Sequence, residues 1–239
     1  MKKLLLTAAA MSLLLANQNT QNEALNALKA SPFYNQIEAA KKQGLKIKAD
    51  KIDGLYVYKL QSPRGPIYIY ITADKKYTFI GNAIDNKTKK PIHLPKNANI
   101  INEGVMFTFG KGKKEIYLVT DPECPFCRKM EAQKKEILAK NYKVHVILLP
   151  LPFHRYAKPM SYYILAAKTD AERAKRMKEV LSGSNKWKNF HPTKEQIAKF
   201  NKELQKARRA ASELEAQGTP SVYDKNFNPI PWPALGEKK

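Results

Sequence analysis

Cys124 and Cys127, the two cysteines of the chain, are separated by two residues and directly follow an apolar run at 116–119. If the chain leaves an apolar strand here and continues as a helix, Cys124 lies at the helix N-terminus. Unpaired backbone N–H groups and the helix dipole favour a negatively charged sulfur at such a position. Because the thiolate is the form that attacks a disulfide, the pattern predicts thiol–disulfide exchange.

Other uses of two cysteines fit the sequence less well. A structural zinc site needs four ligands, and the histidines are scattered without ligand spacing: His93, His145, His154 and His191. A purely structural disulfide between Cys124 and Cys127 would close a very small loop and restrain the unfolded chain little. A redox pair is therefore favoured, and no metal or organic cofactor is implied.

The first 18 residues predict export. A cationic start at Lys2 and Lys3 precedes an apolar stretch at 4–16, which turns polar at Asn17, as in a secretory signal peptide. The alternative is an uncleaved N-terminal anchor, because no A-x-A cleavage site is visible; a lipid anchor is not expected, since no cysteine follows the apolar stretch. Export brings an oxidising compartment, where the cysteines would be reserved for chemistry.

The formal net charge of +22 raises the question of nucleic acid. The lysines are spread along the whole chain and are not interleaved with aromatic residues as on a base-stacking surface. A solvated basic surface is therefore expected, with no nucleic acid partner, and with anionic lipid or acidic proteins as the partners that this charge would attract.

Residues 19–90 predict a small α+β domain. Two helical segments at 21–30 and 34–43 precede short β-prone runs separated by turn residues, at 45–47, 55–60, 67–71 and 77–80. This region brings no cysteines, histidines or carboxylates together, so no catalytic role is assigned to it. A region of this size buries little surface alone, which favours pairing with a second copy of the chain.

Residues 91–104 contain two prolines and few periodic apolar positions, as in a linker. The remainder, 105–239, alternates strand and helix in the manner of an α/β domain. The expected elements are strands at 105–109, 115–120 and 144–149, a helix at 125–140, a helical stretch at 156–216 with breaks at 182–185 and 191–193, and a closing β-hairpin at 221–232.

Two motifs carry a resemblance to a known family: the residues Asp121-Pro122-Glu123-Cys124-Pro125-Phe126-Cys127 and Gly218-Thr219-Pro220-Ser221-Val222. Together with the signal peptide, the small first domain and the helical insertion, they resemble the periplasmic disulfide isomerases of the DsbC/DsbG family over essentially the whole mature chain. The resemblance implies a thioredoxin-like catalytic domain with a helical insertion, preceded by a small α+β, cystatin-like dimerisation domain.

The same resemblance implies roles for individual residues. Cys124 would be the nucleophile and Cys127 the resolving thiol, while Pro220 would be cis and would leave the Thr219 backbone free to align a substrate strand. The family often has threonine before this proline, which favours an isomerase. The dipeptide between the cysteines, Pro125-Phe126, departs from the Gly-Tyr of DsbC and is closer to the Pro-Tyr of DsbG, and it tunes the redox potential.

Asp121 and Glu123 either tune the reactivity of the nearby sulfur or relay a proton, or they are solvated acids in the turn. The expected function is a periplasmic thiol:disulfide interchange protein, an isomerase or reductase that acts on unfolded or misoxidised exported proteins. It would be a homodimer regenerated by a membrane-bound, DsbD-like reductant. The alternatives are a DsbA-like dithiol oxidase and a dimeric chaperone with secondary redox activity.

Overall fold

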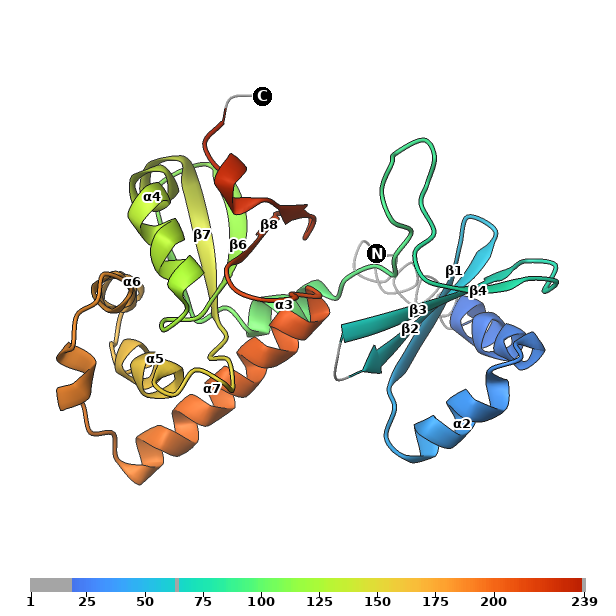
Figure 1. The fold of residues 1–239 in the computed structure, drawn as a ribbon, viewed down its shortest axis with the longest axis horizontal. Coiled ribbons are helices and arrows are strands. Elements are labelled where there is room, and N and C mark those ends of the chain that lie inside the picture. Colours follow the sequence, from blue (N-terminus) through green and yellow to red (C-terminus); the bar gives the residue numbers. More distant parts are fainter. Residues whose placement is uncertain (1–18, 63–64, 238–239) are drawn as a thin grey trace, which may run out of the picture. The chain divides into compact units, whose positions relative to one another are not determined.

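The computed structural model describes residues 19–62 and 65–237, so the predicted signal peptide at 1–18 lies outside the described residues. The chain divides into two compact units, at residues 1–95 and 96–239, and both are drawn in Figure 1. No helix within the described ranges has the length and apolar character needed to cross a membrane.

The first unit is an antiparallel four-stranded sheet in the order β1-β2-β3-β4, with helical segments packed against it. Its elements are a helix across 19–27, η1 (Leu28–Ala30), α2 (Tyr34–Lys42), β1 (Ile47–Ile52), β2 (Leu55–Ser62), β3 (Gly65–Thr72) and β4 (Thr78–Ile80). The helices bury Ala24, Leu28 and Ile37 against Tyr58 and Ile71 of the sheet. The α+β character expected of this region is confirmed.

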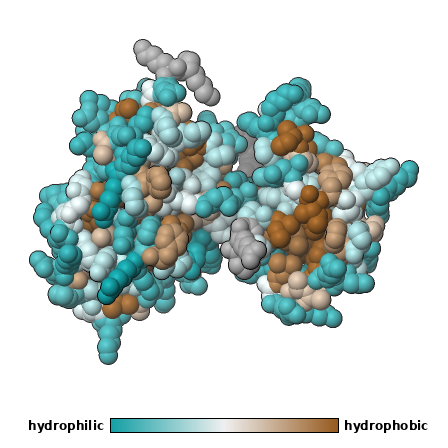
Figure 2. Space-filling model, viewed as in Figure 1, coloured by the Kyte–Doolittle hydropathy of each residue, from teal (hydrophilic) through white to brown (hydrophobic). Residues whose placement is uncertain are grey.

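Several large apolar side chains of the first unit are exposed, namely Ile67, Tyr77, Phe79, Ile80 and Ile84. Figure 2 shows hydrophobic residues gathered on the visible face of this unit. Phe79 and Ile80 lie on β4, an edge strand of three residues. An apolar sheet edge is a common site of association between chains.

The predicted linker at 91–104 is wrong for most of its length. Leu94 is buried in a cluster on the first unit's sheet, and α3 (Ala98–Glu103) belongs to the second unit, where it packs against α7. The side chain of Asn97 caps α3 by accepting the N–H groups of Asn99 and Ile100. Since both halves of this stretch bury apolar side chains, the boundary between the units falls at 95/96.

The second unit is a five-stranded sheet in the order β5-β7-β6-β8-β9, in which β6 and β7 are parallel and the other pairs antiparallel. Its strands are β5 (Phe107–Phe109), β6 (Lys114–Thr120), β7 (Tyr142–Leu148), β8 (Ser221–Asp224) and β9 (Pro229–Ile230). Helix α4 (Pro125–Asn141) connects β6 to β7, and it packs against β7 (Figure 1).

The helical insertion between β7 and β8 consists of α5 (Ala157–Leu165), α6 (Asp170–Leu181), η2 (Lys186–Asn189) and α7 (Lys194–Glu213). Both predicted breaks are present, and a third separates α5 from α6, where the Thr169 side chain caps α6 in a reciprocal capping box with Glu172. All three α-helices contribute side chains to the same apolar core as β6, β7 and the two cysteines. The insertion is thus part of the domain core.

Candidate active site

Cys124 is the N-cap residue of α4, directly where the chain leaves β6 and turns into the helix. Pro125 occupies the first helical position, which suits proline because its fixed φ matches the helix and its missing N–H would have no partner there. The predicted strand-to-helix junction is confirmed. The Cys124 side chain does not cap the helix; its Sγ donates instead to the backbone carbonyl of Thr219, at 3.2 Å.

Both cysteines are reduced and buried, and the small remaining exposure belongs to Cys124, at 4%, whereas Cys127 has none. Burial raises the pKa of Cys127 to about 12 because the surrounding core disfavours a charged sulfur. The backbone N–H of Asp121 donates to Cys127 Sγ at 3.4 Å and opposes this effect in part. Cys127 therefore carries its proton at neutral pH.

The second predicted motif lies beside the first. The Thr219–Pro220 peptide bond is cis, as the resemblance implied, and the turn before β8 is fixed by the Ser221 hydroxyl, which donates to the Gly218 carbonyl at 2.7 Å. The structure thus brings Thr219 to Cys124 across 95 positions of sequence. This juxtaposition leaves the turn before β8 next to the sulfur that would meet a substrate.

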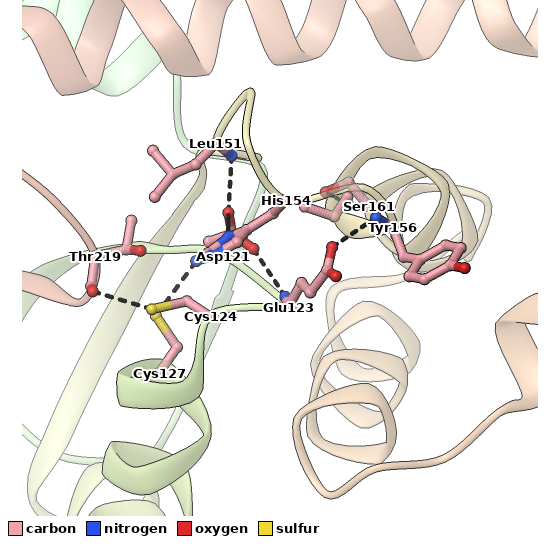
Figure 3. Close-up of polar contacts among 10 residues, drawn as sticks. Asp121, Glu123, Cys124, Cys127, Leu151, His154, Tyr156, Ser161 and Thr219 are labelled. Carbon is pink, nitrogen blue, oxygen red and sulfur yellow. Dashed lines mark hydrogen bonds and ion pairs between the residues drawn. The ribbon is translucent and has the colours of Figure 1, made fainter.

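Asp121 is fully buried and connects three segments around the cysteines (Figure 3). One carboxylate oxygen accepts the Glu123 N–H at 2.8 Å. The other accepts the Leu151 N–H at 2.7 Å and pairs with His154 Nδ1 at 2.9 Å. The alternative of a solvated acid is therefore wrong for Asp121, because the burial of its carboxylate is compensated by these three partners.

Glu123 has a different role, since it lies at the surface of the same turn. Its Oε2 accepts the backbone N–H of Tyr156 at 2.6 Å, which ties the turn before Cys124 to the N-terminus of α5. Glu123 contacts neither sulfur in the described structure. Its observed contribution is to position the loop.

Sequence reasoning missed His154 and Leu151 as neighbours of the site. Asp121 directly follows β6, and Leu149–His154 follow β7. Because β6 and β7 are parallel neighbours, the segments after them meet at the same sheet edge. This topological signal was available from the predicted strand–helix–strand order and would have placed a histidine beside the aspartate.

A rim of exposed aromatic side chains surrounds this turn. Phe126 is 64% exposed, Phe153 76% and Tyr156 42%. Phe153 packs edge-on against His154. The backbone N–H of Tyr156 bonds to Glu123, while its ring packs against Trp187 and points away from the sulfurs (Figure 3). Exposed apolar side chains grouped around the turn of a reactive sulfur are candidates for contact with another molecule.

Among residues 19–62 and 65–237, no group of three or more histidine, cysteine or acidic side chains is close enough to hold a metal ion.

The strand order, the cysteine pair opening α4 and the Thr219–Pro220 turn beside it define a thioredoxin-like redox domain. Residues 108–226 match the family model described as a thioredoxin-like domain. This part of the chain is therefore a thioredoxin-like domain with a CxxC pair, the fold of thiol–disulfide oxidoreductases, preceded by the four-stranded unit.

Solved structures with similarity to the chain include Helicobacter pylori DsbG, at 13% identity and a TM-score of 0.40, covering 80% of this chain and 99% of that one. A thioredoxin-like oxidoreductase from Silicibacter pomeroyi has 16% identity and a TM-score of 0.45, covering 56% and 88%. A disulfide interchange protein from Neisseria gonorrhoeae has 18% identity and a TM-score of 0.41, covering 54% and 89%. No curated protein matches the sequence.

Proposed function

We propose that the protein is an exported, periplasmic thiol:disulfide interchange protein that acts as an isomerase or reductase on misoxidised proteins. The observation that carries the proposal is the placement of Cys124 Sγ at the start of α4, 3.2 Å from the Thr219 carbonyl, with Cys127 buried behind it. A substrate disulfide can approach only the Cys124 side of such a pair.

In the first step, the Cys124 thiolate attacks one sulfur of the substrate disulfide. A Cys124–substrate disulfide forms, the substrate S–S bond breaks, and the other substrate sulfur leaves as a thiolate. In isomerisation, a substrate thiolate then attacks the substrate sulfur of this mixed disulfide, so that a new substrate disulfide forms and Cys124 is released without net electron transfer.

In reduction, Cys127 instead loses its proton and attacks Cys124 Sγ. The substrate leaves as a dithiol, and the protein holds a Cys124–Cys127 disulfide that a membrane-bound dithiol partner of the DsbD type must reduce. The raised pKa of Cys127 slows this second route, because the buried thiol must first be deprotonated. A long-lived mixed disulfide gives the substrate time to rearrange, which favours isomerisation.

We also propose that the first unit pairs two copies of the chain through the exposed apolar edge at β4. The support is the exposure of Phe79 at 41% and Ile80 at 54% on a short edge strand. The aromatic rim of Phe126, Phe153 and Tyr156 would contact the apolar segments of unfolded substrates.

The decisive experiment measures recovery of activity from a substrate protein with scrambled disulfides, using the wild type, Cys124→Ala and Cys127→Ala. Cys124→Ala should be inactive, whereas Cys127→Ala should retain isomerisation and lose net reduction, since only the latter needs the second thiol. Loss of isomerisation in Cys127→Ala would show that rearrangement proceeds through cycles of reduction and oxidation.

Two competing functions have their own readouts. A DsbA-like oxidase would oxidise a reduced substrate rapidly and would be found disulfide-bonded in freshly trapped cells. A dimeric chaperone would suppress aggregation after removal of both cysteines. Either result would replace the proposed isomerase as the main function.

A further inference from the structure

A cavity of about 470 Å³ lies between the segment after β7 and one face of α7. Its walls include Leu151 and His154 from the first segment, Arg155 and Lys158 from the start of α5, and Asn201 and Arg208 from α7. Asn201 and Arg208 lie on the same side of α7, because their separation of seven positions corresponds to about two helical turns. A volume of this size can take a side chain or a small molecule.

The lining is cationic. Arg155, Lys158 and Arg208 all contribute to it, and it contains no aspartate or glutamate. Among the described residues, no carboxylate forms an ion pair with these three side chains. Arg155 and Lys158 lie over the rings of Tyr156 and Tyr162, at 5.4 and 5.8 Å, which leaves their charge unneutralised. Three such cations lining one hollow favour an anionic occupant.

The cavity also offers an amide donor. The Tyr162 hydroxyl donates to Asn201 Oδ1 at 2.7 Å, so the amide oxygen of Asn201 is already used. The NH2 group of Asn201 can then donate a hydrogen bond to an oxygen atom of a ligand. A carboxylate, which has only acceptor oxygens, matches the arginine, lysine and amide donors of this lining.

The cavity shares its wall with the redox site. Leu151 and His154 line the cavity, and both also bond to the buried Asp121 carboxylate, whose backbone N–H donates to Cys127 Sγ. A second hollow of about 840 Å³, along α6, has no such connection and contains its own carboxylate, Glu179, which pairs with Lys186. Of these two hollows, only the first has a lining without carboxylates and a link to the cysteines, which runs through Asp121.

We propose that this cavity is a carboxylate subsite that binds an aspartate or glutamate side chain of the substrate polypeptide, close in sequence to the cysteine under attack. This inference rests on the proposed thiol–disulfide exchange and adds a preference for acidic segments. The net charge of +22 would attract acidic proteins from a distance. The cavity would then select which disulfide of an attracted protein is presented to Cys124.

The test uses three synthetic peptides of one length, each with a single cysteine as its pyridyl disulfide and with Asp, Asn or Lys beside the cysteine. Release of pyridine-2-thione by the reduced full-length protein gives a second-order rate constant for each peptide. The Asp peptide should react about fivefold faster than the Asn peptide, as expected for one partly exposed ion pair. The Lys peptide should be slowest.

The matched variants are Arg208→Gln and Arg209→Gln, which remove the same charge from neighbouring exposed positions of α7, although only Arg208 lines the cavity. Arg208→Gln and the second cavity variant, Lys158→Gln, should reduce the Asp preference severalfold, and Arg209→Gln should keep it. Equal losses in Arg208→Gln and Arg209→Gln would assign the preference to overall charge and overturn the subsite.

Three further outcomes have distinct meanings. The mixed disulfide of glutathione with pyridine-2-thione, a small carboxylate-bearing probe with the same leaving group, would overturn the assignment to polypeptide side chains if it reacted as fast as the Asp peptide and with the same dependence on Arg208. Exchange with all peptides at equal rates would overturn the subsite and leave the proposed function intact. Absence of exchange with every peptide would instead contradict the proposed function.

Discussion

The carboxylate of Asp121 lies 2.9 Å from Nδ1 of His154, while the backbone N–H of the same aspartate donates to Cys127 Sγ at 3.4 Å. One residue thus connects the segment after β7 to the resolving thiol. Its side-chain oxygens also accept the N–H groups of Glu123 and Leu151, so the aspartate is completely surrounded by donors.

Replacing Asp121 with Asn should destabilise the reduced protein. The new NH2 group would face donors, and His154 would lose its partner, at a cost of about 2–4 kcal/mol in unfolding free energy. Urea unfolding of the reduced protein measures this, with Glu123→Gln as the control, because Glu123 makes a single bond near the surface. A cost below that of the control would mean that the Asp121 contacts do not hold the site together.

The raised pKa of Cys127 predicts an alkaline loss of stability. From about pH 9 upward the unfolded thiol ionises while the folded thiol keeps its proton up to about pH 12. The unfolding free energy should then fall by up to about 1.4 kcal/mol per pH unit from this group. Burial also raises the pKa of Tyr223 to about 12, so part of the loss has another origin.

Comparison with Cys127→Ala isolates the cysteine contribution. Denaturant unfolding between pH 8 and 11, with reductant present, should show a shallower decline in the variant than in the wild type. Parallel curves would mean that Cys127 ionises in the folded state much as it does in the unfolded chain.

Gly112→Ala should destabilise the second unit severely. An added Cβ would lie 1.9 Å from the Asn141 carbonyl carbon at the end of α4, and backbone atoms cannot move aside cheaply. The expected cost exceeds ~2 kcal/mol. Gly218→Ala is the matched control, since a Cβ there meets nothing within 4 Å. A thermal melt of both variants checks the difference, and similar melting temperatures would contradict the close approach of the turn to α4.

The proposed pairing through β4 predicts that Ile80→Lys shifts the full chain from dimer to monomer in light scattering. A lysine at this edge would place a charge in the apolar contact. Leu25→Lys, at a similarly exposed apolar position of the same unit, should leave the mass unchanged. If the wild type is monomeric at high concentration, the proposed dimer is wrong. A fragment that begins at Lys96, where the second unit starts, should be monomeric.

Local sequence patterns were sufficient for much of the fold. The apolar run of β6 and the proline at the start of α4 were enough to predict the junction between them, which carries Cys124, to within one residue. The strand β1 was harder, since it was expected at 45–47 and extends over Ile47–Ile52. It is an edge strand with charged residues at Lys48, Asp50 and Lys51, so its apolar pattern is weak.

The contacts that complete the site depend on tertiary structure. His154 carries no local signal for binding Asp121, because the pair forms only when β6 and β7 lie side by side. Helix α3 was missed for a similar reason: six residues with a single fully buried side chain, Ile101, become helical by packing against α7. Prolines nearby made the same stretch resemble a linker.

The shared core described for α5, α6 and α7 means that the helical insertion is not a detachable module. Met177 of α6 and Ala210 of α7 lie in one continuous cluster with Cys127 and Met130 of α4. The slowest-exchanging amides of α4 and α6 should therefore open in the same cooperative event, with equal exchange free energies in native-state hydrogen exchange. The helix that carries the reactive sulfur thus depends for its rigidity on residues of an insertion that begins only after β7.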